Sequence, residues 1–130
     1  MPFISTQHDR HAGSVVGTGH CVPFVREVTG APHTSQWRRG AKVRGGAHPS
    51  GTAIATFDAN GRYANATDGS SHAAILISET ATGLVVMDQW LGQPVQTRTI
   101  RYKGGNGPAC DDADRYYVVG TDTAPATTAA

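Results

Sequence analysis

Residues 19–26 have the sequence Gly19-His20-Cys21-Val22-Pro23-Phe24-Val25-Arg26, and the apolar residues from Cys21 to Val28 fall close to one stripe of a helix. Proline fits there because it lies in the first turn, and Gly30 followed by Pro32 is typical of a helix end. The pattern predicts a short helix that begins at Cys21. Unpaired backbone N–H groups and the helix dipole favour negative charge at that end, so Cys21 is a candidate thiolate nucleophile.

Further runs along the chain have the β-branched and apolar content of strands. Residues 72–78 and 84–90 are joined by a short polar connection, which predicts a β-hairpin in the core of a sheet. The other strand-like runs are residues 52–57, 95–102 and 115–119. Ahead of them, Thr34 or Ser35 could cap a helical turn before the basic loop 44–50. One helix followed by four or five antiparallel strands predicts an α+β fold, with the helix packed on one face of the sheet.

Length and charge limit the function classes. The chain has 130 residues, and 11 Lys and Arg against 10 Asp and Glu give a formal net charge of +1. We expect one domain over residues 1–120 and a disordered Thr/Ala-rich tail over residues 121–130. A charge so close to zero predicts no attraction to nucleic acid or to a membrane surface. No run has membrane-spanning length and residues 1–10 lack a signal-peptide core, so we expect synthesis in the cytoplasm without a standard export signal.

The predicted hairpin brings two polar residues near one end of the sheet. His72 opens one arm, and Asp88 lies late in the other. With the turn centred near position 81, the partner of His72 falls near position 90, so Asp88 lies within a bulge or at a diagonal position. His72 could then act as the base for Cys21, and Asp88 could orient the imidazole. Asp88 also interrupts an apolar run, where a buried charge needs a partner.

Each of these residues also has a simpler interpretation. Cys21 could be a small buried residue, and Asp88 could merely pair with Arg98 or Arg101. A zinc site built from His8, His11, His20 and Cys21 fits no known ligand spacing, so we expect no metal and no other cofactor. The sequence alone does not decide whether Cys21 and Cys110 form a disulfide.

The stretch around Cys21 resembles the nucleophile helix of the papain-like amidases of the CHAP and NlpC/P60 group. Residues 51–57 and 71–77 resemble the strands that follow that helix, the second with its histidine, and Asp88 takes the third catalytic place. More narrowly, residues 19–119 resemble the small bacterial proteins of the BPSL0067 family. The segments that carry this resemblance are the Cys21 helix and residues 29–32, 37–38, 51–57, 72–75 and 88–90.

This resemblance implies a papain-like fold and hydrolysis of amide bonds in peptidoglycan stem peptides. Cys21 would attack the scissile carbonyl, His72 would protonate the leaving amine and later activate water, and Asp88 would orient His72. The backbone N–H of Cys21 would meet the oxyanion, together with a second donor that the sequence does not identify. Trp37, Tyr63 and Trp90 are candidates to line a peptide groove, although aromatic residues at such positions are core residues as often.

The resemblance and the missing export signal together imply an antibacterial toxin that is secreted or delivered to the periplasm of a target cell. Its expected partners are the peptidoglycan peptide and an immunity or inhibitor protein, and we expect a monomer. Two other functions fit the same residues. One is a cysteine protease or deamidase toxin that acts on proteins, and the other is an inactive binding module on the same fold, in which Cys21 would be unreactive.

Overall fold

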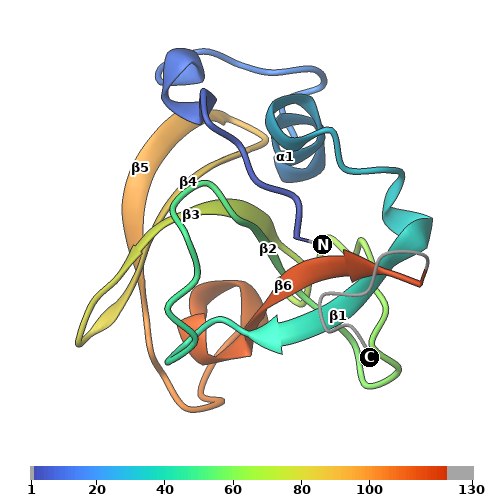
Figure 1. Cartoon of the computed structure of the whole chain (residues 1–130), viewed down its shortest axis with the longest axis vertical. Helices are drawn as coiled ribbons and strands as arrows, with labels where there is room; N and C mark the ends of the chain where they lie inside the picture. The colour runs from blue at the N-terminus through green and yellow to red at the C-terminus, as the bar shows by residue number, and fades with distance from the viewer. Residues whose placement is uncertain (1, 123–130) are drawn as a thin grey trace.

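The computed structural model describes residues 2–122, which form one helix, six strands and four short 3-10 turns (Figure 1). The elements are η1 (His8–His11), α1 (Cys21–Thr29), η2 (Thr34–Gln36), β1 (Trp37–Lys42), β2 (Ala53–Thr56), β3 (Ala73–Glu79), β4 (Gly83–Trp90), β5 (Gln93–Arg101), η3 (Ala109–Asp111), η4 (Ala113–Arg115) and β6 (Tyr116–Thr121). All neighbouring strands pair antiparallel, in the order β1-β6-β2-β3-β4-β5. The predicted α+β arrangement is confirmed.

Helix α1 packs against β3 and β4 and covers one face of the sheet (Figure 1). Phe24 and Val25 are fully buried in this first core, against sheet residues that include Ile75 and Met87. Burial of each such side chain stabilises the fold by about 1.5–3 kcal/mol. The helix ends at Gly30, which adopts a left-handed conformation with φ of 73°. The predicted helix start at Cys21 is confirmed.

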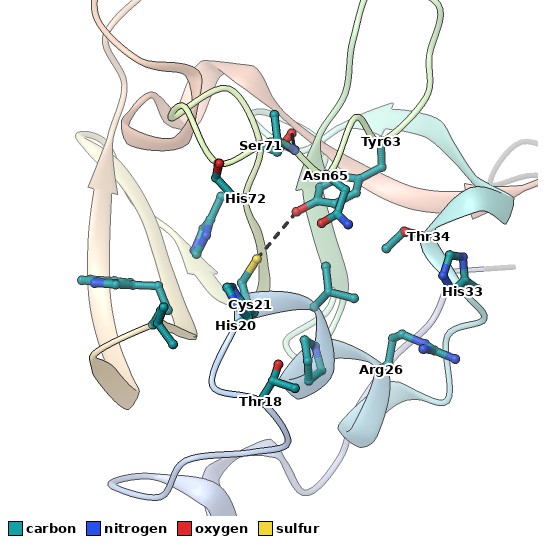
Figure 2. A pocket seen from close by; sticks show the side chains of 16 residues that line it. Thr18, His20, Cys21, Arg26, His33, Thr34, Tyr63, Asn65, Ser71 and His72 are labelled. Carbon is teal, nitrogen blue, oxygen red and sulfur yellow. Dashed lines mark hydrogen bonds between the residues drawn. The ribbon is translucent and has the colours of Figure 1, made fainter.

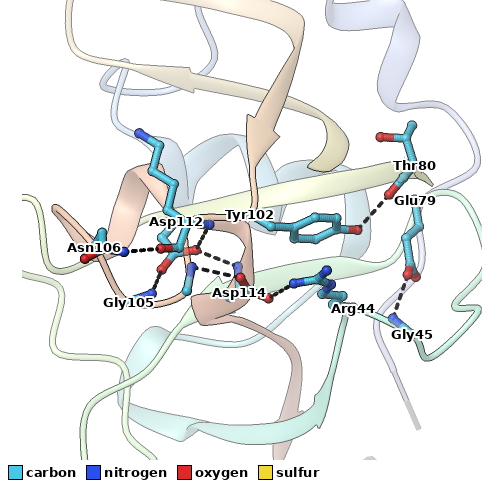
Figure 3. Close-up of polar contacts among 11 residues, drawn as sticks. Arg44, Gly45, Glu79, Thr80, Tyr102, Gly105, Asn106, Asp112 and Asp114 are labelled. Atoms are coloured by element: carbon cyan, nitrogen blue, oxygen red, sulfur yellow. Dashed lines mark hydrogen bonds and ion pairs between the residues drawn. The ribbon is translucent and has the colours of Figure 1, made fainter. Parts of the chain in front are cut away.

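A second core lies on the opposite face of the sheet. It contains Ile54, Leu76, Val86 and Ile100, and Ala113 from the loop between β5 and β6 packs into it. The buried carboxylate of Asp112 fixes that loop, because it accepts hydrogen bonds from the backbone N–H groups of Lys103, Gly105 and Asp114 (Figure 3). Arg44, which follows β1, pairs with Asp114 at 2.8 Å and ties the loop to the other end of the sheet.

Strand β1 is the main departure from the predicted elements. The sequence predicts a helical turn and then a loop, whereas η2 is followed at once by a strand that pairs with β6. His33 caps η2 through its side chain, so the predicted cap at Thr34 or Ser35 is wrong. The buried residue of β1 is Trp37, while its Arg and Gly residues give no apolar alternation. The strand forms because β6 supplies hydrogen-bonding partners across the sheet, which local sequence does not reveal.

The ends of the chain differ from expectation in small ways. The first twenty residues contain η1 and an isolated bridge from Ile4 to Thr52, neither of which is among the predicted elements. Strand β6 runs through Thr121, opposite Trp37, so this residue of the predicted tail belongs to the sheet. The rest of that tail, residues 123–130, lies outside the described residues. No helix within residues 2–122 has the length and apolar character needed to span a membrane.

Candidate active site

A cleft of about 560 Å³ opens where the start of α1 meets the start of β3 (Figure 2). Cys21, as the first residue of α1, and His72, directly before β3, both line it. Tyr63 and Trp90 line it too, from the loop after β2 and from the end of β4. Figure 2 shows the Cys21 thiol and the His72 imidazole facing each other across the cleft. The structure therefore brings together the two residues predicted as nucleophile and base.

Asp88 lies behind His72 and is fully buried. Its Oδ2 atom accepts a hydrogen bond from His72 Nε2 at 2.7 Å. The register explains the contact, since Ile75 pairs with Met87 and the same register puts position 72 opposite position 90. Asp88 is thus the diagonal neighbour that the sequence predicts. Because Nε2 bonds to the carboxylate, Nδ1 is the ring nitrogen that can exchange a proton with Cys21.

Asp88 has a second partner on β5. Arg98 Nε donates to Asp88 Oδ1 at 3.2 Å and Oδ2 at 2.9 Å, and Arg98 Nη2 lies 2.8 Å from Oδ2. Arg98 also lies over Trp90, with 4.8 Å between the guanidinium carbon and the ring centroid. Of the two arginines expected as alternatives, Arg98 is the partner, whereas Arg101 lies opposite Gly83. The pairing with His72 and the pairing with Arg98 therefore coexist at one carboxylate.

These contacts set the protonation of the site. Burial raises the pKa of the Asp88 carboxyl, but hydrogen bonds from His72 and Arg98 outweigh burial and hold the pKa below its ordinary value. Burial lowers the pKa of His72, but the bonds to Asp88 and Cys21 and their charges raise it to about 9. At neutral pH, His72 is therefore an imidazolium that faces Cys21 and is held by an ionised Asp88.

The pKa of the Cys21 thiol is shifted in the opposite direction, downward. Burial raises its pKa, but a hydrogen bond with His72 and the positive charge of that ring bring the pKa below the ordinary value of 9.0. Hydrogen bonds from the Tyr63 hydroxyl and from the backbone N–H of Ala73 add to the effect. His20, the residue before α1, makes no side-chain cap, so it leaves the N–H groups of the first turn open to negative charge. The arrangement favours a thiolate–imidazolium pair.

Tyr63 places its hydroxyl 3.6 Å from Cys21 Sγ. Its ring is held between Trp37 and Phe57, with centroid distances of 5.0 Å and 6.5 Å. Burial and the neighbouring Cys21 charge raise the pKa of Tyr63 far above its ordinary value, so the hydroxyl stays neutral and can donate. The sequence predicts Tyr63 only as a residue of the groove wall, and its contact with the thiol is new.

A family model described as Domesticated amidase effector 2 matches residues 3–119. The chain belongs to this family. A Domesticated amidase effector 2 of Ixodes scapularis is 38% identical over 105 residues, covering 76% of this chain and 69% of the tick protein. A Type VI secretion amidase effector 2 protein of Salmonella typhi is 37% identical over 119 residues, covering 80% of this chain and 87% of that protein.

A solved structure of a Type 6 secretion amidase effector 2 (Tae2) resembles this family member closely. The TM-score is 0.79 at 28% sequence identity, over 94% of this chain and 96% of that chain. The family and the fold together confirm the predicted papain-like α+β fold and the predicted amidase class. The matching family model carries the amidase effector name, so the narrower resemblance to the BPSL0067 family stays a prediction.

Two of the three aromatic residues predicted for a groove line the cleft of this amidase. Trp90 is 40% exposed and Tyr63 reaches the thiol, whereas Trp37 is fully buried and does not line the cleft. Trp37 is a core residue because β1 turns its side chain toward the first core, where its Nε1 donates to the carbonyl of Pro32 at 2.9 Å. Its prediction as a groove residue is wrong.

Gln89 is a residue of the site that sequence reasoning missed. Its amide donates to the carbonyls of Val16 at 2.7 Å and His20 at 2.8 Å, and its Oε1 accepts from the backbone N–H of Val16 at 2.9 Å. These bonds tie β4 to the segment that enters α1, and so fix the position of Cys21. The signal in the sequence was a second polar residue beside Asp88 in an apolar strand.

Neither alternative use of the cysteines forms in this family member. Cys21 and Cys110 are both free, and Cys110 lines a smaller recess of about 290 Å³ on the Arg98 side of His72. Within residues 2–122, no three His, Cys, Asp or Glu side chains gather so as to hold a metal ion. Of the zinc ligands considered, His8 hydrogen bonds with Ser5 and His11 packs edge-on against Phe24.

Proposed function

We propose that this chain is a cysteine amidase that hydrolyses amide bonds in peptidoglycan stem peptides. One observation carries the proposal, namely that a thiol with a lowered pKa, a buried imidazole and a buried carboxylate meet at a single open cleft. An inactive binding module has no use for this arrangement, which keeps three ionisable groups charged next to a hydrophobic core.

In the proposed reaction, Cys21 Sγ attacks the carbonyl carbon of the scissile amide and forms a carbon–sulfur bond. The proton on His72 Nδ1 passes to the amide nitrogen as the carbon–nitrogen bond breaks, so the amine leaves and a thioester remains. His72 then takes a proton from a water molecule, whose oxygen attacks the thioester, and the Cys21 thiolate leaves. Asp88 orients the imidazole through its bond with Nε2.

The tetrahedral intermediate needs donors for its oxyanion. The backbone N–H of Cys21 at the start of α1 is one, and we assign the Tyr63 hydroxyl as the second because it lies beside the sulfur and remains protonated. Trp90 and the Tyr63 ring would contact the bound peptide. No step of this mechanism requires a cofactor or a metal.

We infer the biological setting from the relatives. The Salmonella typhi relative carries the name of a type VI secretion amidase effector, and we propose the same kind of delivery for this chain, into the periplasm of a target cell. It would act as a monomer with one hydrolase domain, which extends past the predicted limit of residue 120 to include Thr121. An immunity protein would protect the producing cell. The resemblance to the BPSL0067 family is part of the same proposal.

Digestion of purified peptidoglycan sacculi tests this function. We expect new stem-peptide ends, detected by mass spectrometry, with the wild-type protein but not with Cys21→Ala. Cys110→Ala is the matched control, because it removes the other cysteine and should leave the digest unchanged. Identical product profiles for wild type and Cys21→Ala would refute the proposal. Cleavage of added protein substrates in place of sacculi would instead favour a toxin that acts on proteins.

A further inference from the structure

Basic side chains outnumber acidic ones in the lining of the cleft. Among the sixteen residues that line it in the described part of the chain, the ionisable side chains besides Cys21 and Tyr63 are all basic, and none is Asp or Glu. They are His20, Arg26, His33 and His72. Of these, Arg26 is the guanidinium, a group that is always protonated in proteins. A cleft lined in this way attracts anionic ligands and repels cationic ones.

Arg26 lies on the exposed side of α1, and Figure 2 shows it with His33 at the end of the cleft away from His72. Its Nε donates to the carbonyl of Ala31 at 3.3 Å, which anchors the side chain. Its terminal nitrogens have no hydrogen bond or ion pair within residues 2–122. Arg26 also lines a second hollow together with the neighbouring acid, Glu27, which does not line the cleft. The guanidinium therefore presents an unpaired fork of donors beside the cleft.

The other end of the cleft has a different charge. There the recess beyond His72 is lined by Arg98 and Asp111. The charge of Arg98 is already matched, because its Nε and Nη2 atoms both contact Asp88. Asp111 adds a negative charge to the lining of this recess. A substrate that carries a carboxylate is therefore favoured with that carboxylate toward Arg26 and disfavoured in the reverse orientation.

We propose that the Arg26 end of the cleft binds a free carboxylate of the substrate peptide, so that the amidase selects acidic peptides and binds them in one direction. This inference rests on the proposed function, since it names the class of peptide that the same cleft accepts. Arginine suits the role because its planar fork binds a carboxylate through two parallel hydrogen bonds. Arg26 would be a specificity residue and would take no part in bond cleavage.

The test compares two substrates and matched variants. One substrate is a set of peptides released from sacculi with their carboxylates free, and the other is the same set with carboxylates converted to carboxamides by carbodiimide and ammonium. For Arg26→Gln we expect KM on the free-acid peptides to rise about tenfold with kcat little changed, which is the usual size of one lost charge-assisted contact. On the carboxamides, wild type and Arg26→Gln should be equal. Arg26→Lys should fall between them.

Arg39→Gln is the control, because it removes the same charge from an exposed position on β1 outside the cleft. The inference fails if Arg26→Gln behaves like Arg39→Gln, or if wild type hydrolyses both peptide sets equally. Calorimetric binding to the Cys21→Ala protein decides the point without turnover, since tighter binding of the free acids supports the inference and equal binding overturns it. Absence of Cys21-dependent hydrolysis would refute the proposed function separately.

Discussion

Asp88 is a carboxylate shared between two cations, His72 on the catalytic side and Arg98 on the other. Because Arg98 holds both carboxylate oxygens, it fixes the direction from which Asp88 meets the imidazole. Its positive charge also makes the carboxylate a weaker partner for a protonated His72. Arg98 thus acts on the proposed base through Asp88, as a positioning residue.

Replacing Arg98 tests this positioning role. We expect Arg98→Met to lower kcat about tenfold, because Asp88 loses its fixed orientation, and to move the basic limb of the pH–rate profile upward, because a cation near His72 is gone. Arg98→Lys should restore the position of that limb in part. The pH dependence of kcat/KM checks this. A loss of activity with an unshifted profile would mean that Arg98 serves stability alone.

The two free cysteines differ in the direction of their pKa shifts. His72 lowers the pKa of Cys21, whereas burial and the nearby Asp111 raise that of Cys110. We expect iodoacetamide to modify Cys21 much faster than Cys110 at pH 6–7, as followed by peptide mass mapping. His72→Ala should bring the Cys21 reaction up to the pH range of an ordinary thiol. Equal reactivity of both cysteines would favour an inactive binding module.

At the scale of elements, the helix start and the hairpin register were predictable because both depend on local patterns. Apolar spacing placed Cys21 at the start of α1, and the position of the turn fixed the diagonal relation of His72 and Asp88. Strand β1 was not predictable, because Arg and Gly interrupt it and its partner β6 is distant in sequence. The Tyr63 hydroxyl was missed for a similar reason, since a loop without periodicity carries no sign of where its side chains point.

Gln89 connects β4 to the segment that enters α1, and its replacement should break this connection. In Gln89→Leu, the backbone groups of Val16 and His20 lose their partners, which we expect to cost about 2–4 kcal/mol in the free energy of unfolding. Activity should fall further than stability explains, because the segment before Cys21 is no longer held. Urea unfolding and single-turnover rates measure the two effects. Gln96→Leu, a half-buried glutamine opposite Asp88 on β5, is the control and should change both much less.

At the scale of the molecule, the charged pair determines how stability responds to pH. The pKa of His72 rises on folding from 6.5 to about 9, so alone it contributes stability that is full below pH 6.5 and lost as the pH rises through 9. The pKa of Cys21 falls on folding, so its contribution is full above 9.0 and lost as the pH falls through its lowered pKa. Above the lowered pKa of Cys21 and below pH 9 the two slopes oppose each other, because unfolding returns the imidazolium proton to the thiol.

Removing the Cys21 thiol should reveal how His72 alone makes the free energy of unfolding depend on pH. We expect the free energy of unfolding of Cys21→Ala to fall as the pH rises above 6.5, by at most about 1.4 kcal/mol per pH unit, while that of wild type changes less there. The fall ends at a lower pH than 9, because Cys21 no longer helps to raise the pKa of His72. Urea titrations at three pH values between 6.5 and 9 measure it. Cys110→Ala should follow the wild type, because the pKa of that thiol is raised above 9.0. Parallel slopes in wild type and Cys21→Ala would contradict the thiolate–imidazolium pair.

The strand order also determines when this protein becomes active. Strand β6 is the last strand within residues 2–122, yet it lies between β1 and β2 (Figure 1). Until residue 121 has left the ribosome, β1 lacks its partner strand and has only the bridge from Arg38 to Arg62. Trp37, which contacts the ring of Tyr63, then has nothing to pack on from β6. Such long-range pairing forms late and slowly. In a nascent chain, the cleft around Cys21 is therefore incomplete. Because of this topology, we expect activity only after β6 has been synthesised and has paired with β1 and β2.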